Sequence, residues 1–276
     1  MTINCKGQLI DLSSPKVMGI LNVTPDSFYD GGNYTNKDAI LNQVETMLND
    51  GATFIDIGAY SSRPGADFVS EDEELRRLIP VIELILEHYP DALLSIDTFR
   101  SNVAKIAIEK GAAIINDISA GHLDEHMLQT IATLKVPYIM MHMRGTPQTM
   151  QSLSDYDNLL KDILFYFSER LEKTKALGIV DTICDPGFGF AKTLEQNYEL
   201  LNQLELFDTF ELPILVGVSR KSMIYKALDT TAQHALNGTT ALNMLALQKG
   251  ASILRVHDVK EAMECITLND LLKQND

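Results

Sequence analysis

Eight short apolar segments are spread along the chain, and longer segments with helical patterning separate them. Successive positions in these short segments are apolar on both alternating faces, which is typical of parallel strands buried on two sides. This alternation constrains the fold more than any other feature, because it predicts an α/β protein built on a buried parallel sheet. The expected strands cover residues 16–22, 53–60, 93–99, 113–119, 137–143, 182–187, 214–220 and 253–259.

The number of strands and the chain length favour a (β/α)8 barrel, a fold that typically takes about 250 residues. A doubly wound open sheet is the alternative, but its first strand usually leads into a glycine-rich phosphate turn. Here the first strand ends in Asn-Val-Thr-Pro-Asp-Ser-Phe, residues 22–28, with no such turn. No linker rich in proline, glycine or serine divides the chain. We expect one α/β domain over residues 1–276, a TIM barrel with a short N-terminal extension at residues 1–15.

Two helix starts and one helix end carry recognisable signals. Asn36 is placed to cap a helix, and Gly51 suits the C-terminal end of the same helix. Ser70 and Glu73 have the spacing of a capping box ahead of an apolar helical face. The acidic run at residues 71–74 is therefore best explained as the first turn of a helix.

Composition excludes several classes of protein. Of the 276 residues, 45% are hydrophobic and 22% charged, which is ordinary for a soluble globular protein. The formal net charge of −15 argues against general nucleic-acid binding, although a pocket can still attract a small anion. The three cysteines form no CxxC pair, the N-terminus does not resemble a secretory signal, and no apolar run approaches the roughly 18 residues of a membrane span. We expect a soluble, reduced, cytoplasmic protein.

Polar or charged residues follow the apolar part of every expected strand. Such groups are costly in a buried sheet unless partners satisfy them, and catalytic groups of a barrel project from the carboxyl ends of its strands. Their presence at all eight ends favours a functional site over coincidence. In chain order they are Asn22; Ser61, Ser62 and Arg63; Asp97; Asn116 and Asp117; His142 and Arg144; Asp185; Ser219, Arg220 and Lys221; and Arg255 and His257.

These side chains divide into two sets with different chemistry. The cationic set comprises Arg63, Arg220, Lys221, Arg255 and His257. Together with the neutral oxygen of Asn22 and a magnesium ion, cations of this kind suit a phosphate-bearing ligand. The second set, Asp97, Asn116 and Asp185, can bind the N–H donors and carbonyl of a polar heterocycle. The two sets together predict a heterocycle that bears a phosphate or diphosphate.

Two other motifs match sites of different protein classes only in part. Residues 187–193, Gly-Phe-Gly-Phe-Ala-Lys-Thr, have Ala191 where a Walker A loop needs glycine. His122, Glu125 and His126 match the inverted zinc-protease pattern, but no third ligand is evident and a solvated helix start explains them better. We expect neither a nucleotide triphosphatase nor a zinc protease.

A series of motifs from Lys16 to Val259 resembles the dihydropteroate synthase family, in the family's order. The motifs are MGILNVTPDSF, SSRPGA, SIDTFR, IINDIS, DPGFGFAKT, GVSRKSMI, NGTTA and ILRVHDV. The resemblance implies a (β/α)8 barrel that forms homodimers. It also implies an activity: joining the diphosphate ester of 6-hydroxymethyl-7,8-dihydropterin to 4-aminobenzoate, with release of diphosphate, in folate synthesis. The alternatives are a methyltetrahydrofolate-binding methyltransferase domain and a non-catalytic pterin-binding module.

The resemblance also implies roles for individual residues. Asn22 ligates magnesium on the diphosphate. The pterin is held by Asp97, Asn116, Asp185 and Lys221. Arg255 and His257 lie near the diphosphate, Ser62 and Arg63 follow the second barrel strand, and Ser222 lies near the aminobenzoate carboxylate. The walls of the aminobenzoate slot are Phe28, Pro64 and Phe190. The residues expected to act on the reacting groups are Arg63, Lys221, Arg255 and His257.

One loop departs from the family pattern. Two glycines commonly precede Ser-Thr-Arg-Pro-Gly, whereas this chain has Ala59 in place of the second glycine and Ser62 in place of the threonine. Serine keeps the hydroxyl group, so its hydrogen bonding is expected to persist. Acquired sulfonamide-resistant relatives in this family lack the Arg-Pro-Gly that stands here as Arg63, Pro64 and Gly65. The resemblance therefore implies an ordinary housekeeping form of the enzyme.

Overall fold

The computed structural model describes residues 1–23, 34–60 and 68–273. Its parallel strands follow one another around a barrel in the order β8-β7-β6-β5-β4-β3-β10-β9. A parallel bridge between Cys184 and Ile214 joins β8 to the chain just before β9, so the barrel is nearly closed. The strands are β3 (Lys16–Asn22), β4 (Phe54–Gly58), β5 (Leu93–Asp97), β6 (Ile114–Asp117), β7 (Tyr138–Met141), β8 (Thr182–Asp185), β9 (Leu215–Val216) and β10 (Ile253–Val256). The predicted (β/α)8 TIM barrel is confirmed.

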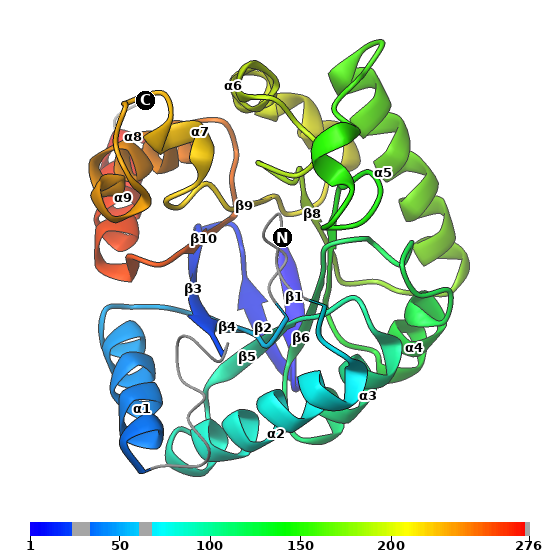
Figure 1. Ribbon diagram of the computed structural model, residues 1–276, viewed down its shortest axis with the longest axis vertical. Coiled ribbons are helices and arrows are strands. Elements are labelled where there is room, and N and C mark those ends of the chain that lie inside the picture. Colours follow the sequence, from blue (N-terminus) through cyan, green and yellow to red (C-terminus); the bar gives the residue numbers. More distant parts are fainter. Residues whose placement is uncertain (24–33, 61–67, 274–276) are drawn as a thin grey trace.

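Helices surround the strands on the outside of the barrel (Figure 1). The α-helices are α1 (Tyr34–Asn49), α2 (Glu71–His88), α3 (Ser101–Glu109), α4 (Met127–Leu134), α5 (Leu159–Ala176), α6 (Leu194–Asn202), α7 (Ser222–Tyr225), α8 (Leu236–Gln248) and α9 (Val259–Lys273). Three short 3-10 helices are η1 (Met150–Ser152), η2 (Leu204–Phe210) and η3 (Ala232–His234). None of the helices among the described residues is both long and apolar enough to cross a membrane.

The helix boundaries agree with the sequence signals in all but one case. Gly51 follows α1 with φ of 101°, a conformation that glycine adopts without strain. Ser70 caps α2 by accepting a hydrogen bond from the backbone N–H of Glu73. The prediction that Asn36 caps a helix is wrong, because α1 already begins at Tyr34. Asn36 therefore lies within the first turn of the helix, and the first buried side chain among residues 37–49 is Ile40.

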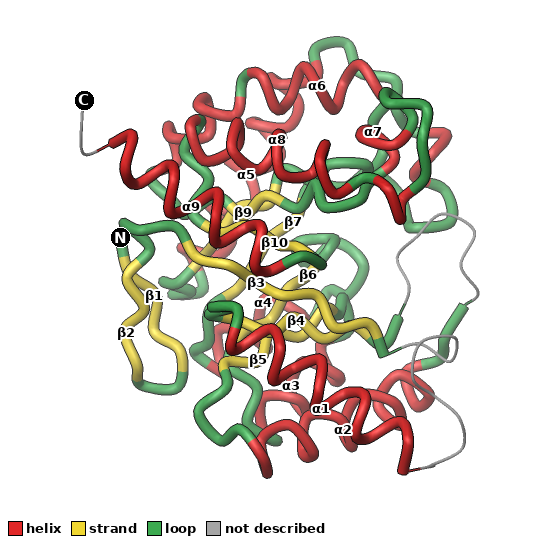
Figure 2. Tube along the Cα trace, turned by 90° about the vertical axis from the view of Figure 1, so that its left-hand side faces the viewer, coloured by secondary structure: helices red, strands yellow, loops and turns green. Residues whose placement is uncertain are grey.

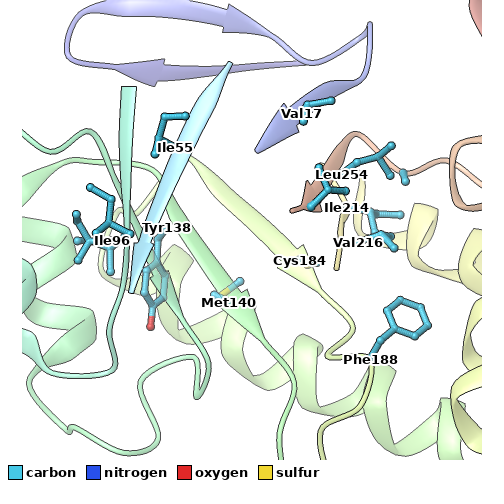
Figure 3. Close-up of a cluster of buried hydrophobic side chains, with 14 of the residues drawn as sticks. Val17, Ile55, Ile96, Tyr138, Met140, Cys184, Phe188, Ile214, Val216 and Leu254 are labelled. Atoms are coloured by element: carbon cyan, nitrogen blue, oxygen red, sulfur yellow. The ribbon is translucent and has the colours of Figure 1, made fainter. Parts of the chain in front are cut away.

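The main apolar core lies between the barrel strands and the surrounding helices. Figure 3 shows part of this layer, including Val17, Tyr138 and Met140. Cys184 belongs to the same layer and is almost fully buried, as strand alternation from Asp185 predicts. The side chain of Met140 likewise lies in this outer layer rather than inside the barrel.

A β-hairpin closes the amino-terminal end of the barrel. Residues 1–15 contain the two antiparallel strands β1 (Thr2–Cys5) and β2 (Gln8–Asp11), which lie at one end of the barrel in Figure 2. Their buried side chains form a separate apolar cluster with the first residues of the barrel strands, including Met18, Phe54 and Ile253. Since this end is filled by apolar side chains, a polar site belongs to the opposite end, where the strands terminate.

Candidate active site

The carboxyl ends of the strands bring several of the predicted side chains together. Asn22, Asp97 and Asp185 are the last residues of β3, β5 and β8. Strand register places Asp97 between Gly58 of β4 and Asn116 of β6, and Gly58 is in turn paired with Asn22. Neighbouring strands therefore present carboxylate and amide groups at a single mouth of the barrel.

Arg255 joins these strands from β10. Its Nε atom lies 2.7 Å from Oδ2 of Asp56, and its Nη2 atom lies 3.0 Å from Oδ2 of Asp97. The side-chain amide of Asn116 donates to the same Asp56 oxygen at 3.2 Å. One network of charged and polar groups thus spans β4, β5, β6 and β10 inside the mouth of the barrel.

The ionisable groups of this mouth titrate far from their usual ranges. Burial raises the pKa of Asp97 to about 7, although the Arg255 charge acts in the opposite direction. Burial also raises the pKa of Asp185, while Lys221 and the N–H of Gly187 act to lower it. Burial lowers the pKa of Lys221 to about 8, and Asp185 opposes that shift. Strongly shifted groups that face each other in this way are characteristic of functional sites.

Lys221 lies against the loop that follows β8. Its ammonium donates to the carbonyl oxygen of Phe188 at 2.5 Å and lies 5.0 Å from the centre of the Phe190 ring. Gly217 lies next to both Lys221 and Arg255: a Cβ atom placed on it would be 3.9 Å from the Lys221 ammonium and 3.8 Å from the Arg255 Cβ. The structure therefore brings together Lys221, Arg255 and Phe190, three of the predicted site residues, on the β8–β10 side of the mouth.

His257 and Ser222 occupy the loops beyond β10 and β9. Nδ1 of His257 lies 3.0 Å from the hydroxyl of Ser219, which also accepts a hydrogen bond from the His257 backbone N–H at 3.1 Å. This double contact fixes the imidazole relative to the loop that carries Lys221. Ser222 is partly buried and begins α7 directly after Lys221.

Two predicted cations have other partners. Arg220 forms a two-pronged ion pair with Asp258, at 2.7 and 2.8 Å, and donates to two backbone carbonyls. The guanidinium is thus already paired with a carboxylate, and its place in the cationic set stays a prediction. Arg144 likewise binds Asp162 at 2.8 Å and stacks over the Tyr156 ring.

Asp117 shapes a turn rather than contributing to the polar network. Its carboxylate accepts hydrogen bonds from the backbone N–H groups of Ser119 and Gly121, from the Ser119 hydroxyl and from the Tyr138 hydroxyl. These contacts hold the loop after β6. A polar strand end can thus serve local structure even when its neighbour in sequence, Asn116, faces the site.

Four predicted site residues and one further candidate lie outside the described residues: Phe28, Ser62, Arg63 and Pro64, together with Ser61. Their assigned roles stay predictions that follow from the resemblance.

Two residues of the site were missed by the sequence analysis. Asp56 is fully buried and binds both Arg255 and Asn116. A signal for it exists, since it is the one charged residue in an otherwise apolar strand, where an unpaired charge is very costly. The second residue is Lys192, whose ammonium donates to the carbonyl oxygen of Phe190 at 3.0 Å.

The described residues contain no group of three or more His, Cys, Asp or Glu side chains placed to hold a metal ion. Asn22 is a partly buried amide at the end of β3. Magnesium commonly keeps several water ligands and binds one or two protein groups plus substrate phosphates. A single amide oxygen at the mouth therefore fits a metal that arrives with a diphosphate.

A barrel that gathers two acids, an amide and a lysine at its mouth has the features expected of enzymes that bind a polar heterocycle. A family model described as "Pterin binding enzyme" matches residues 18–257, which defines the class as a pterin-binding barrel.

Curated and solved proteins define the family more narrowly. The dihydropteroate synthase of Escherichia coli K12 is 44% identical over 269 residues, covering 96% of this chain and 94% of its own. The Yersinia pestis dihydropteroate synthase, solved with a sulfonamide drug, superposes with a TM-score of 0.92 at 44% identity, covering 99% of this chain and 100% of its own. The Xanthomonas albilineans enzyme, solved with 4-aminobenzoic acid, has a TM-score of 0.91 at 37% identity, covering 99% and 98%. The chain belongs to the dihydropteroate synthase family.

Proposed function

We infer that this protein is a dihydropteroate synthase, a transferase that joins a dihydropterin methyl diphosphate to 4-aminobenzoate in folate synthesis. The observation that carries this inference is the convergence of Asp97, Asn116, Asp185 and Lys221 at the mouth of a barrel that is 44% identical to dihydropteroate synthases over nearly its whole length.

The pterin site is proposed to use both signs of charge. The carboxylates of Asp97 and Asp185 accept hydrogen bonds from pterin N–H groups, whereas the Asn116 amide and the Lys221 ammonium bind its carbonyl and ring nitrogens. The Arg255 guanidinium, 3.0 Å from Asp97, favours the ionised carboxylate and so opposes part of the rise in its pKa that burial causes. Charge-assisted hydrogen bonds in a buried site of this kind are short and directional.

The proposed reaction needs charge stabilisation more than proton transfer. The bond between the pterin methylene carbon and the diphosphate oxygen breaks, and diphosphate leaves with the electron pair. The amine of 4-aminobenzoate then forms the new carbon–nitrogen bond and gives up one proton to solvent. An aromatic amine is largely unprotonated at neutral pH, so a strong general base is not required. Arg63, Arg255 and His257 are proposed to stabilise the leaving diphosphate, while the buried carboxylates favour the cationic pterin.

Magnesium is proposed as the cofactor. The Asn22 side chain, at the end of β3, would hold it on the diphosphate, and the bound ion would supply positive charge to the leaving group. The solved relative with 4-aminobenzoic acid supports 4-aminobenzoate as a substrate, and the match to the pterin-binding family supports a pterin as the other. The complex of another relative with a sulfonamide supports the proposal that sulfonamides compete for the same slot.

A homodimer is proposed on the basis of the family resemblance. Exposed leucines on the two packed helices α8 and α9 support this proposal, because large exposed apolar groups on neighbouring helices are typical of an interface. They are Leu245, Leu268, Leu271 and Leu272. A cytoplasmic location is proposed as well, since all three cysteines are buried free thiols, which suits a reducing compartment.

One assay separates the inferred function from the two alternatives. The purified protein, pterin diphosphate, 4-aminobenzoate and magnesium should release diphosphate in step with dihydropteroate formation. A methyltransferase domain would bind a methylated folate and release no diphosphate. A non-catalytic module would bind the pterin ester and leave it intact. Absence of diphosphate release from folded protein would overturn the inference.

A further inference from the structure

The turn between β8 and α6, residues 186–193, follows a tightly constrained path. Gly187, Gly189 and Ala191 have φ values of 74°, 83° and 49°, so three left-handed residues fall within five positions. A Cβ atom on Gly187 would lie only 2.1 Å from the backbone oxygen of His142. The turn therefore packs directly on the end of β7, at a distance that no side chain other than glycine's hydrogen permits.

The ammonium of Lys192 is buried at the centre of this turn. It donates to the carbonyl oxygen of Gly187 at 2.9 Å and to that of Phe190 at 3.0 Å, and it lies 3.0 Å from Nδ1 of His142. A lysine ammonium has three N–H donors, so all three are used. Two of the acceptors belong to the turn itself, and the third ties the turn to the end of β7.

His142 is suited to the role of acceptor. Burial lowers the pKa of His142 well below its ordinary value, and the neighbouring charge of Lys192 lowers it further. The imidazole is therefore neutral, and its unprotonated Nδ1 can accept from the Lys192 ammonium. Burial lowers the pKa of Lys192 to about 7; Asp185 opposes this shift, whereas Lys221 and Arg144 add to it. The three donors are those of the protonated ammonium.

The opposite side of the same turn faces the candidate active site. The N–H of Gly187 donates to Asp185 at 2.8 Å, the carbonyl of Phe188 accepts from Lys221, and the Phe190 ring lies beside that ammonium. The bonds of Lys192 to residues 187 and 190 bracket Phe188. Displacement of the turn would thus move one wall of the site and the acceptor of Lys221 together.

We propose that Lys192 is a positioning residue for the condensation: it holds the turn at 186–193 so that Phe190 forms the wall of the aminobenzoate slot and Phe188 anchors Lys221. This proposal rests on the proposed function. Lys192 touches neither substrate. It acts through the backbone of the turn, which carries Phe190 and contacts Asp185 and Lys221.

The kinetic test is Lys192→Met, which keeps the unbranched side chain as far as Cε and removes all three donors. The KM for 4-aminobenzoate should rise about tenfold or more, and the KM for the pterin diphosphate should rise by a smaller factor, because Lys221 and Asp185 lose part of their support from the turn. Lys249→Met is the matched control, since Lys249 joins the carbonyl of Asn202 and the carboxylate of Glu205 at 2.6 and 2.9 Å, away from the barrel mouth. A purely structural loss would reduce active enzyme and kcat without moving either KM.

A second pair of variants tests the link to β7. His142→Asn keeps an acceptor at the position of Nδ1 and should retain a nearly normal KM for 4-aminobenzoate. His142→Leu removes the acceptor and should raise the KM for 4-aminobenzoate toward the value measured for Lys192→Met. Equal effects of the two substitutions would overturn the role assigned to the imidazole nitrogen in the proposal.

Hydrogen–deuterium exchange tests the turn without using activity. The amides of Gly187, Gly189 and Phe190 are hydrogen-bonded within this region and should exchange about tenfold faster or more in Lys192→Met. Unchanged exchange, or an unchanged KM for 4-aminobenzoate in a folded variant, overturns the proposal. If the wild-type protein released no diphosphate, the proposed function would fail, while the exchange result would still decide whether Lys192 holds the turn.

Discussion

The guanidinium of Arg255 rests against the carboxylate of Asp56, with Nε 2.7 Å from Oδ2, although 199 positions separate the two residues in the chain. Asp56 is fully buried, and its other oxygen, Oδ1, has no hydrogen-bond partner among the described residues. Its charge also acts to raise the pKa of Asp97. Asp56 therefore orients Arg255 and influences the protonation of Asp97 from inside the barrel.

The pH dependence of catalysis should reflect Asp97 and Lys221. Asp97, with a pKa raised to about 7, must lose its proton to act as a carboxylate, and Lys221, with a pKa lowered to about 8, must keep its proton. The ratio kcat/KM for the pterin diphosphate should therefore rise with pH through about 7 and fall through about 8. In Lys221→Met the residual kcat/KM should no longer fall as the pH rises through about 8. A flat wild-type profile between pH 6 and about 9 would contradict both assignments.

Replacing Asp56 by Asn should move the acid limb of that profile to lower pH. The substitution removes a negative charge whose effect is to raise the pKa of Asp97, so Asp97 ionises more easily. Activity at the optimum should also fall, because Arg255 loses the charged partner that orients it. Asp181→Asn, at the amino-terminal end of the barrel, is the control and should leave the limb in place. An acid limb that stays at the wild-type pH in Asp56→Asn would contradict the effect assigned to the Asp56 charge.

Asp185→Asn should keep the fold and reduce activity roughly 10- to 1000-fold, because a charge-assisted hydrogen bond contributes about 1.5–3 kcal/mol. Asp185 ends β8, where it accepts from the Gly187 N–H and lies in the field of Lys221. Thermal melting should show a folded protein, and steady-state diphosphate release measures the loss. Near-normal turnover would remove Asp185 from the site.

The barrel could be predicted from the sequence because each buried parallel strand is apolar on both faces. The hairpin at residues 1–15 could not, since its two strands have only four residues each and owe their stability to apolar contacts with the barrel floor. Asn22, Asp97 and Asp185 were predictable because strand ends converge in any barrel. Asp56 was missed because its role depends on a partner distant in sequence, Arg255. For the same reason the pairing of Arg220 with Asp258 could not be predicted.

Cys184→Ser should reduce stability more than catalysis. The thiol is almost fully buried in the apolar layer between barrel and helices, on the opposite face of β8 from Asp185. A buried cysteine behaves as a small apolar group, and a hydroxyl without a partner there costs about 1–3 kcal/mol. The melting temperature should fall while the kcat of the folded enzyme stays close to normal. The reverse result, lost activity with unchanged melting, would require a role for the thiol.

Binding of 4-aminobenzoate should depend on magnesium diphosphate. Arg63 is proposed to bind the diphosphate, and the family resemblance assigns the next residue, Pro64, to the wall of the aminobenzoate slot. An anion that fixes Arg63 therefore also restrains Pro64, since the two are covalent neighbours. In calorimetric titrations, 4-aminobenzoate or a sulfonamide should bind weakly to the protein alone and much more tightly once diphosphate and magnesium are supplied. Linkage requires that 4-aminobenzoate raise the affinity for diphosphate by the same factor.

Omission of magnesium, or the change Asn22→Ala, should weaken this coupling. Equal affinities with and without magnesium diphosphate would overturn the coupling and leave the synthase assignment intact.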